Sequence, residues 1–169
     1  KVLVAAGRKP NIEDLDLKAA GILFDNRGIK VNEHLQTSVE KIYALGDVIA
    51  GPKFAHTATY EAHIAAVNIL SGRNVMNTDF SKNSWVLFSD PEIASVGYTE
   101  AQAVKDQHDI MTGTYDYKID ATAQINGLTI GSLKFVVERK TLAIIGIHIC
   151  VQGASSIIGE AALIVSKGL

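Results

Sequence analysis

One Gly-Asp pair carries the clearest chemical signal in this 169-residue chain. Residues 42–45 are apolar and predict a short strand, which ends abruptly at Gly46 and Asp47. Glycine lets a backbone approach a ligand closely, and the aspartate places one carboxylate at the carboxyl end of the strand. Open α/β sheets bind nucleotides at that edge, where a carboxylate can accept hydrogen bonds from sugar hydroxyls. The alternative is an aspartate that only caps the next turn.

The segment after this pair predicts a second binding element. The loop Gly-Pro-Lys-Phe-Ala-His at residues 51–56 leads into a predicted helix over residues 57–70. The start of a helix directs backbone N–H groups and a positive dipole end at whatever lies ahead of it. The stretch from Lys53 to His56 is therefore a candidate ligand contact, with His56 acting through its backbone. A surface loop before a capped helix is the alternative.

The remaining reactive side chains give weaker signals. Cys150 follows an alternating apolar strand pattern, where a lone cysteine is usually a small buried hydrophobe. His34, His63 and His108 are scattered without the spacing of metal ligands, and His148 is expected to be packed or hydrogen-bonded. No metal site is predicted.

Two types of structure must position these residues. The first part predicts a buried strand over 2–5, a helical turn over 14–21 and a hairpin around the turn 25–28. The helix over 57–70 carries a face of small residues, which predicts close packing of that face against a neighbouring element or a ligand: Ala58, Ala62, Ala65, Ala66 and Ile69.

From residue 84 onward the pattern becomes α+β. Strands are predicted over 85–88, 93–97, 131–137 and 143–149, with an edge strand over 113–119. Thr99 is the expected N-cap of a helix. The last helix, over 155–166, has apolar residues on more than one face, so a second surface must cover it.

Composition sets the broad class. The chain is 47% hydrophobic and 20% charged with a formal net charge of -2, which gives no electrostatic reason to expect nucleic acid or a membrane surface as partner. A single cysteine is typical of a reducing compartment, so a cytoplasmic location is expected. The first residues enter a strand pattern and the last ones stop within a helix, and we therefore expect a fragment of a longer protein.

These motifs together resemble the FAD-dependent pyridine nucleotide-disulfide oxidoreductases, a family that includes dihydrolipoamide dehydrogenases and mercuric reductases. TSVEKIYALGDV resembles the second flavin-binding motif, and GPKFAHTATYEA the loop and helix after it. DPEIASVGYTEAQA and GSLKFVVERKTLAIIGIHICVQGASSIIGEAALIVSKG resemble the dimerisation domain. The resemblance covers essentially the whole chain.

The resemblance implies a fold of two parts and a set of roles. Residues 1–76 would form the end of a Rossmann-like FAD/NAD(P)-binding domain, and residues 77–169 an α+β dimerisation domain with an antiparallel sheet and helices. FAD would be bound by Gly46, Asp47 and the segment Lys53, Phe54, Ala55 and His56. Gly7 would pass close to NAD or NADP, unless it is a simple turn glycine. A homodimer would form through the last helix.

The same resemblance implies what the chain lacks. The family's N-terminal GxGxxG, its CxxxxC cysteine pair, its NAD(P) fingerprint and its acid-base histidine motif are absent from these residues. Hydride and thiol chemistry need those parts, so we expect the chain alone to be catalytically inactive. The parent would transfer electrons between NAD(P)H, FAD and a small-molecule or protein-bound disulfide. Alternatives are a transhydrogenase-type flavoenzyme without a thiol centre, or a module that only dimerises.

Overall fold

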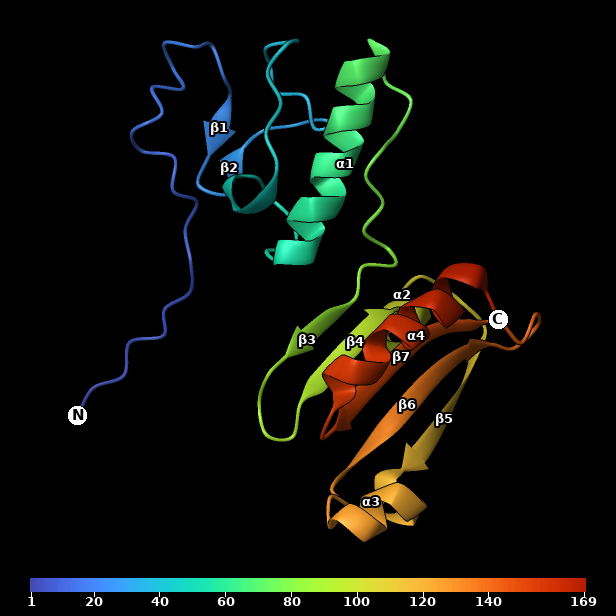
Figure 1. Ribbon diagram of the computed structural model, residues 1–169. Coiled ribbons are helices and arrows are strands. Elements are labelled where there is room, and N and C mark those ends of the chain that lie inside the picture. Colours follow the sequence, from blue (N-terminus) through green and yellow to red (C-terminus); the bar gives the residue numbers. More distant parts are fainter. The chain divides into compact units, whose positions relative to one another are not determined.

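The computed structural model describes all residues from 1 to 169, and the chain folds as two compact units (Figure 1). Unit 1 comprises residues 1–79 and unit 2 comprises residues 80–169. None of the helices combines the length and the apolar character that crossing a bilayer requires.

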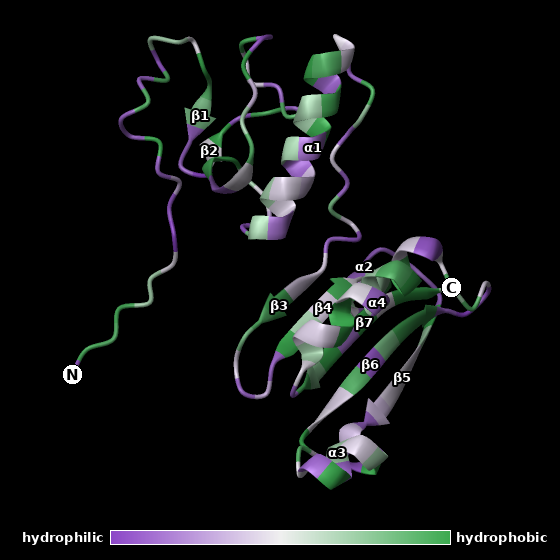
Figure 2. Cartoon of the chain, in the orientation of Figure 1, coloured by the Kyte–Doolittle hydropathy of each residue, from purple (hydrophilic) through white to green (hydrophobic).

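The N-terminal segment of unit 1 corrects one expectation. The strand predicted over residues 2–5 does not form: Val2 and Leu3 are 91% and 90% exposed in an irregular stretch, seen as the hydrophobic N-terminal end in Figure 2. A run that is apolar at every position suits a strand covered on both faces, and such a strand exists only when neighbours pair with it. Unit 1 offers residues 2–5 no neighbouring strand.

The next elements follow their local signals. The predicted turn ends in a Schellman arrangement, because the Ile22 N–H donates to Leu17 O at 2.9 Å and the Gly21 N–H donates to Lys18 O at 3.1 Å. The predicted hairpin is confirmed and is short: β1 (Phe24–Asp25) pairs antiparallel with β2 (Gly28–Ile29). Two residues, Asn26 and Arg27, form its tip.

The strand predicted over residues 42–45 is also wrong. Only an isolated bridge between Gln36 and Tyr43 forms there, and a short 3-10 helix, η1 (Gly46–Val48), follows it. Ile49 then bridges to Ile29 in parallel. The apolar run still enters the core of unit 1, where Ala44 is buried, but a strand needs a continuous ladder and these residues have single bridges only.

The extent of the helix after η1 was predicted well, but its buried face was not. It is α1 (Ala55–Ser71), and Gly72 ends it in the left-handed conformation with φ 65°. The face of small residues does not pack on another element of unit 1, since Ala62, Ala66 and Ile69 are exposed. The buried face is instead partly polar: Thr57, Glu61, Ile64, Ala65 and Asn68. It covers a core that includes Leu17, Ile22, Ile29, Leu35 and Ile49.

The segment after α1 is held to unit 1 by one buried amide. Asn68 accepts hydrogen bonds from the backbone N–H groups of Val75 and Met76, both at 2.9 Å. Its side-chain NH₂ donates to Met76 O at 2.8 Å. Because Asn68 is 1% exposed, these bonds satisfy a buried polar group and define the path of residues 75–76.

Unit 2 contains an antiparallel five-stranded sheet in the order β3-β4-β7-β6-β5. Its strands are β3 (Trp85–Leu87), β4 (Ile93–Gly97), β5 (Ile110–Asp116), β6 (Gly131–Glu138) and β7 (Ile144–Val151). All five predicted strands are therefore confirmed, and β5 lies at an edge as expected, although it begins three residues earlier than predicted.

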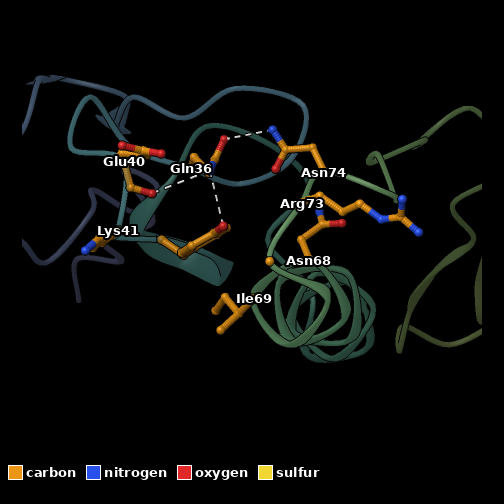
Figure 3. A pocket seen from close by; sticks show the side chains of 9 residues that line it. Gln36, Glu40, Lys41, Asn68, Ile69, Arg73 and Asn74 are labelled. Atoms are coloured by element: carbon orange, nitrogen blue, oxygen red, sulfur yellow. Dashed lines mark hydrogen bonds between the residues drawn. The ribbon is translucent and has the colours of Figure 1, made fainter.

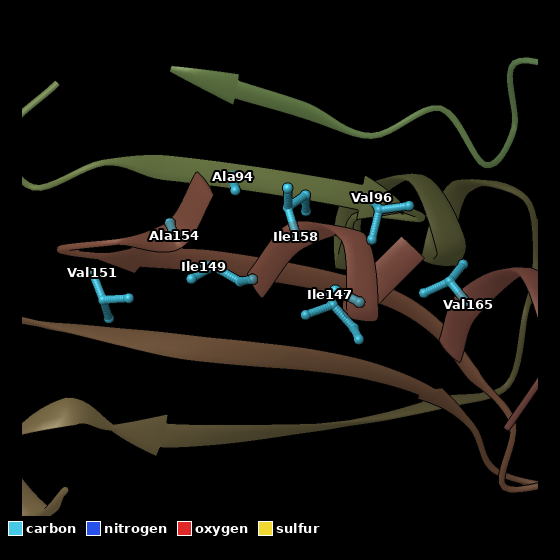
Figure 4. Close-up of a cluster of buried hydrophobic side chains, with 9 residues drawn as sticks. Ala94, Val96, Ile147, Ile149, Val151, Ala154, Ile158 and Val165 are labelled. Atoms are coloured by element: carbon cyan, nitrogen blue, oxygen red, sulfur yellow. The ribbon is translucent and has the colours of Figure 1, made fainter. Parts of the chain in front are cut away.

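Helix α4 (Ala154–Lys167) covers one face of this sheet (Figure 1). Its buried residues Ile158, Ala161 and Val165 pack with Ala94, Val96, Ile147, Ile149 and Val151 of the sheet (Figure 4). Ile157 and Leu163, on the rest of the helix, are 37% and 56% exposed. The prediction that α4 is apolar beyond the face it packs against the sheet is confirmed.

Two shorter helices complete unit 2. Thr99 caps α2 (Glu100–Lys105) in a capping box with Gln102, as predicted. Helix α3 (Ala121–Asn126) was not predicted, although Asp120 caps it by accepting from the Ala123 N–H at 2.8 Å. Aspartate followed by a short alanine-containing segment and Gly127 was the signal that could have revealed it.

Candidate functional site

The Gly46–Asp47 pair forms a rigid turn with an outward carboxylate. Gly46 begins η1 with φ 74°, a left-handed conformation that a side chain rarely adopts. A Cβ at Gly46 would also lie 3.4 Å from the Ala58 side chain of α1. The Asp47 side chain is 57% exposed, and its Oδ2 lies 3.4 Å from Arg8 Nη1. The turn therefore offers one accessible carboxylate from a constrained backbone.

Lys53 is brought to the same turn, through the backbone rather than the carboxylate. Its Nζ donates to Asp47 O at 2.7 Å and lies 3.4 Å from Ile49 O. The ammonium thus ties the loop ahead of α1 to one carbonyl within η1 and to the carbonyl of the residue directly after it. This contact stabilises the relative position of the two elements that the sequence singled out.

The start of α1 lies two residues earlier than expected, at Ala55. Phe54 is the N-cap and supplies no side-chain hydrogen bond to the first turn. Its ring stacks on His56, with 5.4 Å between centroids and 14° between planes. The first turn of a 17-residue helix is therefore not capped by its N-cap side chain, and it presents the positive end of the helix dipole.

The position of Gly7 gives no indication of a bound ligand. It has φ 89° in the exposed N-terminal segment, and a Cβ there would meet nothing within 4 Å. The side chain of its neighbour Arg8 contacts the Asp47 carboxylate. The Arg8 side chain thus reaches the Gly46–Asp47 turn from the residue after Gly7.

The sequence interpretation missed Glu61. This residue is 1% exposed, and its Oε2 accepts a hydrogen bond from the Gly46 N–H at 2.6 Å. Burial raises the pKa of the Glu61 carboxyl above its ordinary value, the Gly46 hydrogen bond opposes this, and the negative charge of Asp47 raises it further. The signal was its spacing, because Glu61 falls on the same helical face as Ile64, Ala65 and Asn68.

The other candidates are structural. His148 lies 2.7 Å from Ser95 Oγ through Nδ1 and 3.0 Å from Tyr98 O through Nε2. Since the carbonyl can only accept, Nε2 carries a proton and the Ser95 hydroxyl donates to Nδ1 in the neutral ring. Cys150 is half-buried on β7 with a free thiol. No group of three or more His, Cys, Asp or Glu side chains is arranged to hold a metal ion.

A polar cavity of about 450 Å³ lies elsewhere in unit 1, at the carboxyl end of α1 (Figure 3). Gln36 organises it: its carbonyl oxygen accepts from Asn74 at 3.1 Å and its amide donates to the Tyr43 hydroxyl at 3.2 Å. None of the predicted ligand-binding residues lines this cavity.

Comparison with known proteins identifies the family. Residues 83–169 match the dimerisation domain of the pyridine nucleotide-disulphide oxidoreductases, and residues 1–62 match the pyridine nucleotide-disulphide oxidoreductase model. The chain belongs to this family.

Individual relatives agree with that result. A mercuric reductase of Lysinibacillus sphaericus is 41% identical over 100% of this chain and 31% of its own length. A dihydrolipoyl dehydrogenase of Geobacillus stearothermophilus is 39% identical over 99% of this chain and 36% of its own length. The chain thus spans about a third of the length of these relatives.

Solved structures show the same fold. The HOCl-induced flavoprotein disulfide reductase RclA from Escherichia coli matches 99% of this chain and 39% of its own, with a TM-score of 0.88 and 26% identity. The expected fold class, the end of an FAD/NAD(P)-binding domain followed by an α+β dimerisation domain, is confirmed.

Proposed function

We propose that this chain supplies one side of an FAD site and the dimerisation domain of a flavoprotein oxidoreductase. The whole enzyme would transfer electrons between NAD or NADP, FAD and a disulfide or dithiol. In this assignment residues 1–76 belong to the FAD/NAD(P)-binding domain and residues 77–169 to the dimerisation domain. The single observation that carries the proposal is the exposed Asp47 carboxylate on the constrained η1 turn, beside the start of α1.

The residues present fit FAD. Asp47 would accept hydrogen bonds from the ribityl hydroxyls, which are donors without charge and suit a carboxylate acceptor. Gly46 and Lys53 would hold the turn, and the N–H groups from Phe54 to His56 would face the pyrimidine edge of the flavin, where a positive dipole end favours negative charge. When bound, FAD would supply the ring that accepts hydride. Gly7 would border the nicotinamide nucleotide.

The proposed homodimer rests on unit 2. The family model that matches residues 83–169 is a dimerisation domain, and α4 exposes Ile157 and Leu163 beside its buried face. Burying such apolar area against a second copy would favour association. The single cysteine supports a cytoplasmic location.

An absorption scan near 450 nm tests the flavin assignment. The 169-residue chain is mixed with FAD, passed through a desalting column and scanned. A retained flavin band would support the assignment, since it requires that this side of the site binds FAD by itself. Asp47→Ala should weaken FAD affinity about tenfold or more, because a hydrogen bond to a charged group is lost. Asp14→Asn, a change at another exposed aspartate of unit 1, is the matched control and should bind as the unaltered chain does.

A second function, a module that only dimerises, is favoured by the exposed apolar residues of α4. Analytical ultracentrifugation of the same samples separates the two. A folded dimer without retained flavin would support the module and count against the flavin site. Equal FAD affinity in the unaltered chain and in Asp47→Ala would contradict the role of Asp47 directly.

A further inference from the structure

The core of unit 1 contains a carboxylate where an apolar side chain would be expected. Glu61 is 1% exposed and shares the inward face of α1 with Thr57, Ile64 and Ala65. Glutamate is almost never fully buried unless a partner compensates it, because transfer of a carboxylate from water is costly. Its position therefore calls for a specific explanation.

Its contact points to the turn that carries Asp47. Glu61 Oε2 accepts from the Gly46 N–H at 2.6 Å, a bond between residues 15 apart in sequence. On the other side of Asp47, Lys53 Nζ donates to the Asp47 carbonyl at 2.7 Å. A third bond, from the Ile49 N–H to Gly46 O at 3.1 Å, closes the turn. The backbone is thus held both before and after Asp47, and the side chain is left to face outward.

The electrostatic cost of this arrangement is evident. Burial and the nearby Asp47 charge both disfavour the ionised form of Glu61, and both raise its pKa. The other charged groups at the turn are cations that contact Asp47 itself: Arg8 at the carboxylate and Lys53 at the main-chain carbonyl. A well-packed apolar residue would avoid that cost, so the carboxyl group serves local geometry more than stability.

We propose that Glu61 is a positioning residue, whose buried carboxyl group holds the Gly46 N–H and so sets the direction in which Asp47 presents its carboxylate to the hydroxyl groups of a ligand. The ligand part of this inference rests on the proposed flavin function. The positioning part concerns only the 169-residue chain and can be tested without flavin.

Three variants of the chain separate positioning from general destabilisation. Glu61→Ala removes the acceptor for the Gly46 N–H. Glu61→Gln removes the charge and keeps a carbonyl oxygen that can accept the same bond. Ile64→Ala, in the next turn of the same buried face, destabilises the core but leaves the Glu61 carboxyl group in place, so it serves as the matched control.

Amide hydrogen exchange by NMR is the deciding measurement. The Gly46 amide is compared with the Ile22 amide of the same unit, which bonds to Leu17 O. Relative to Ile22, exchange at Gly46 should accelerate on the order of tenfold or more in Glu61→Ala. It should stay near the unaltered ratio in Glu61→Gln and in Ile64→Ala. An unchanged ratio in Glu61→Ala, or the same acceleration in Ile64→Ala, overturns the positioning role.

FAD titration of the same proteins tests the ligand part. FAD affinity should fall about tenfold in Glu61→Ala, recover largely in Glu61→Gln and be unaffected in Ile64→Ala under conditions where each is folded. If the unaltered chain binds no FAD, the flavin proposal fails for this chain while the exchange data still decide the positioning role. If FAD binds with equal affinity in all four proteins, Glu61 does not position a flavin contact.

Discussion

Two glutamates, one in each unit, make the same kind of hydrogen bond with opposite consequences. In unit 1, Glu61 accepts from the Gly46 N–H at 2.6 Å; in unit 2, Glu92 accepts from the Ser155 N–H at 2.8 Å, near the start of α4. The pKa of Glu61 is raised, first by burial, whereas the hydrogen bonds to Ser155 lower the pKa of Glu92. A backbone N–H stabilises a carboxylate in both, so burial decides the sign.

The cores of the two units also differ in polarity. The buried face of α1 includes Thr57, Glu61 and Asn68, each a polar group that needs a defined partner. The core of unit 2 is built from alanine, valine and isoleucine between α4 and the sheet. Apolar packing tolerates small shifts better than hydrogen-bond networks do. Unit 1 therefore depends on defined hydrogen bonds near its candidate site, whereas unit 2 depends on apolar packing between α4 and the sheet.

The largest expected effect comes from the apolar core. Ile149→Ala, at a residue 2% exposed, should lower the free energy of unfolding of unit 2 by about 2–5 kcal/mol through lost burial and the cavity left behind. Urea unfolding measures the loss, and amide exchange assigns it to a unit. Ile125→Ala, at a residue 84% exposed on α3, should cost much less. Equal losses for the two changes would contradict the assignment of the unit 2 core.

A smaller loss is expected from the polar core of unit 1. Asn68→Ala leaves the N–H groups of Val75 and Met76 without their acceptor and Met76 O without its donor, which should cost about 1–3 kcal/mol. Exchange at these two amides should accelerate while the strands of unit 2 remain protected. Asn74→Ala, at the rim of the polar cavity, is the comparison variant. Protection that persists at residues 75–76 would show that Asn68 does not hold them.

The raised pKa of Glu61 makes the stability of unit 1 depend on pH. The folded pKa of Glu61 lies above its ordinary value of 4.5, so the native state binds the proton more tightly than the unfolded chain. The stability of unit 1 relative to Glu61→Gln is therefore greatest below pH 4.5 and falls as pH rises through the folded pKa. Urea unfolding of both proteins across this window measures the effect. If the unaltered chain instead became more stable relative to Glu61→Gln as pH rises, the assigned direction of the pKa shift would be wrong.

The smallest effect is the opposite response of unit 2. Because the folded pKa of Glu92 lies below its ordinary value of 4.5, its contribution is present above pH 4.5 and is lost as pH falls through the folded pKa. In Glu92→Gln the stability of unit 2 should no longer fall for this reason as pH decreases, and its stability at low pH should be nearly unchanged. Calorimetry over the acid range tests it, with Glu160→Gln on α4 as the control. If the stabilities of the unaltered chain and of Glu92→Gln changed with pH in parallel, Glu92 would not have this role.

Local signals in the sequence were sufficient for much of the fold. The strands of unit 2, the hairpin around residues 25–28 and the Thr99 cap depend on side-chain alternation and turn chemistry within a few residues. The position of the Gly46–Asp47 turn was also indicated locally, since a glycine with positive φ followed by aspartate is typical of a turn. These features could be predicted because the residues that mark them lie within a few positions of one another in the sequence, even where the strands then pair over long separations.

Tertiary structure decided the rest. The apolar runs at residues 2–5 and 42–45 resemble strands, but a strand forms only where a partner completes its hydrogen bonds. Which face of α1 is buried, and that Glu61 holds the Gly46 N–H, depended on the elements packed against the helix. Sequence periodicity identifies positions that share a face, whereas the free energy of burying that face is set by neighbours distant in the chain.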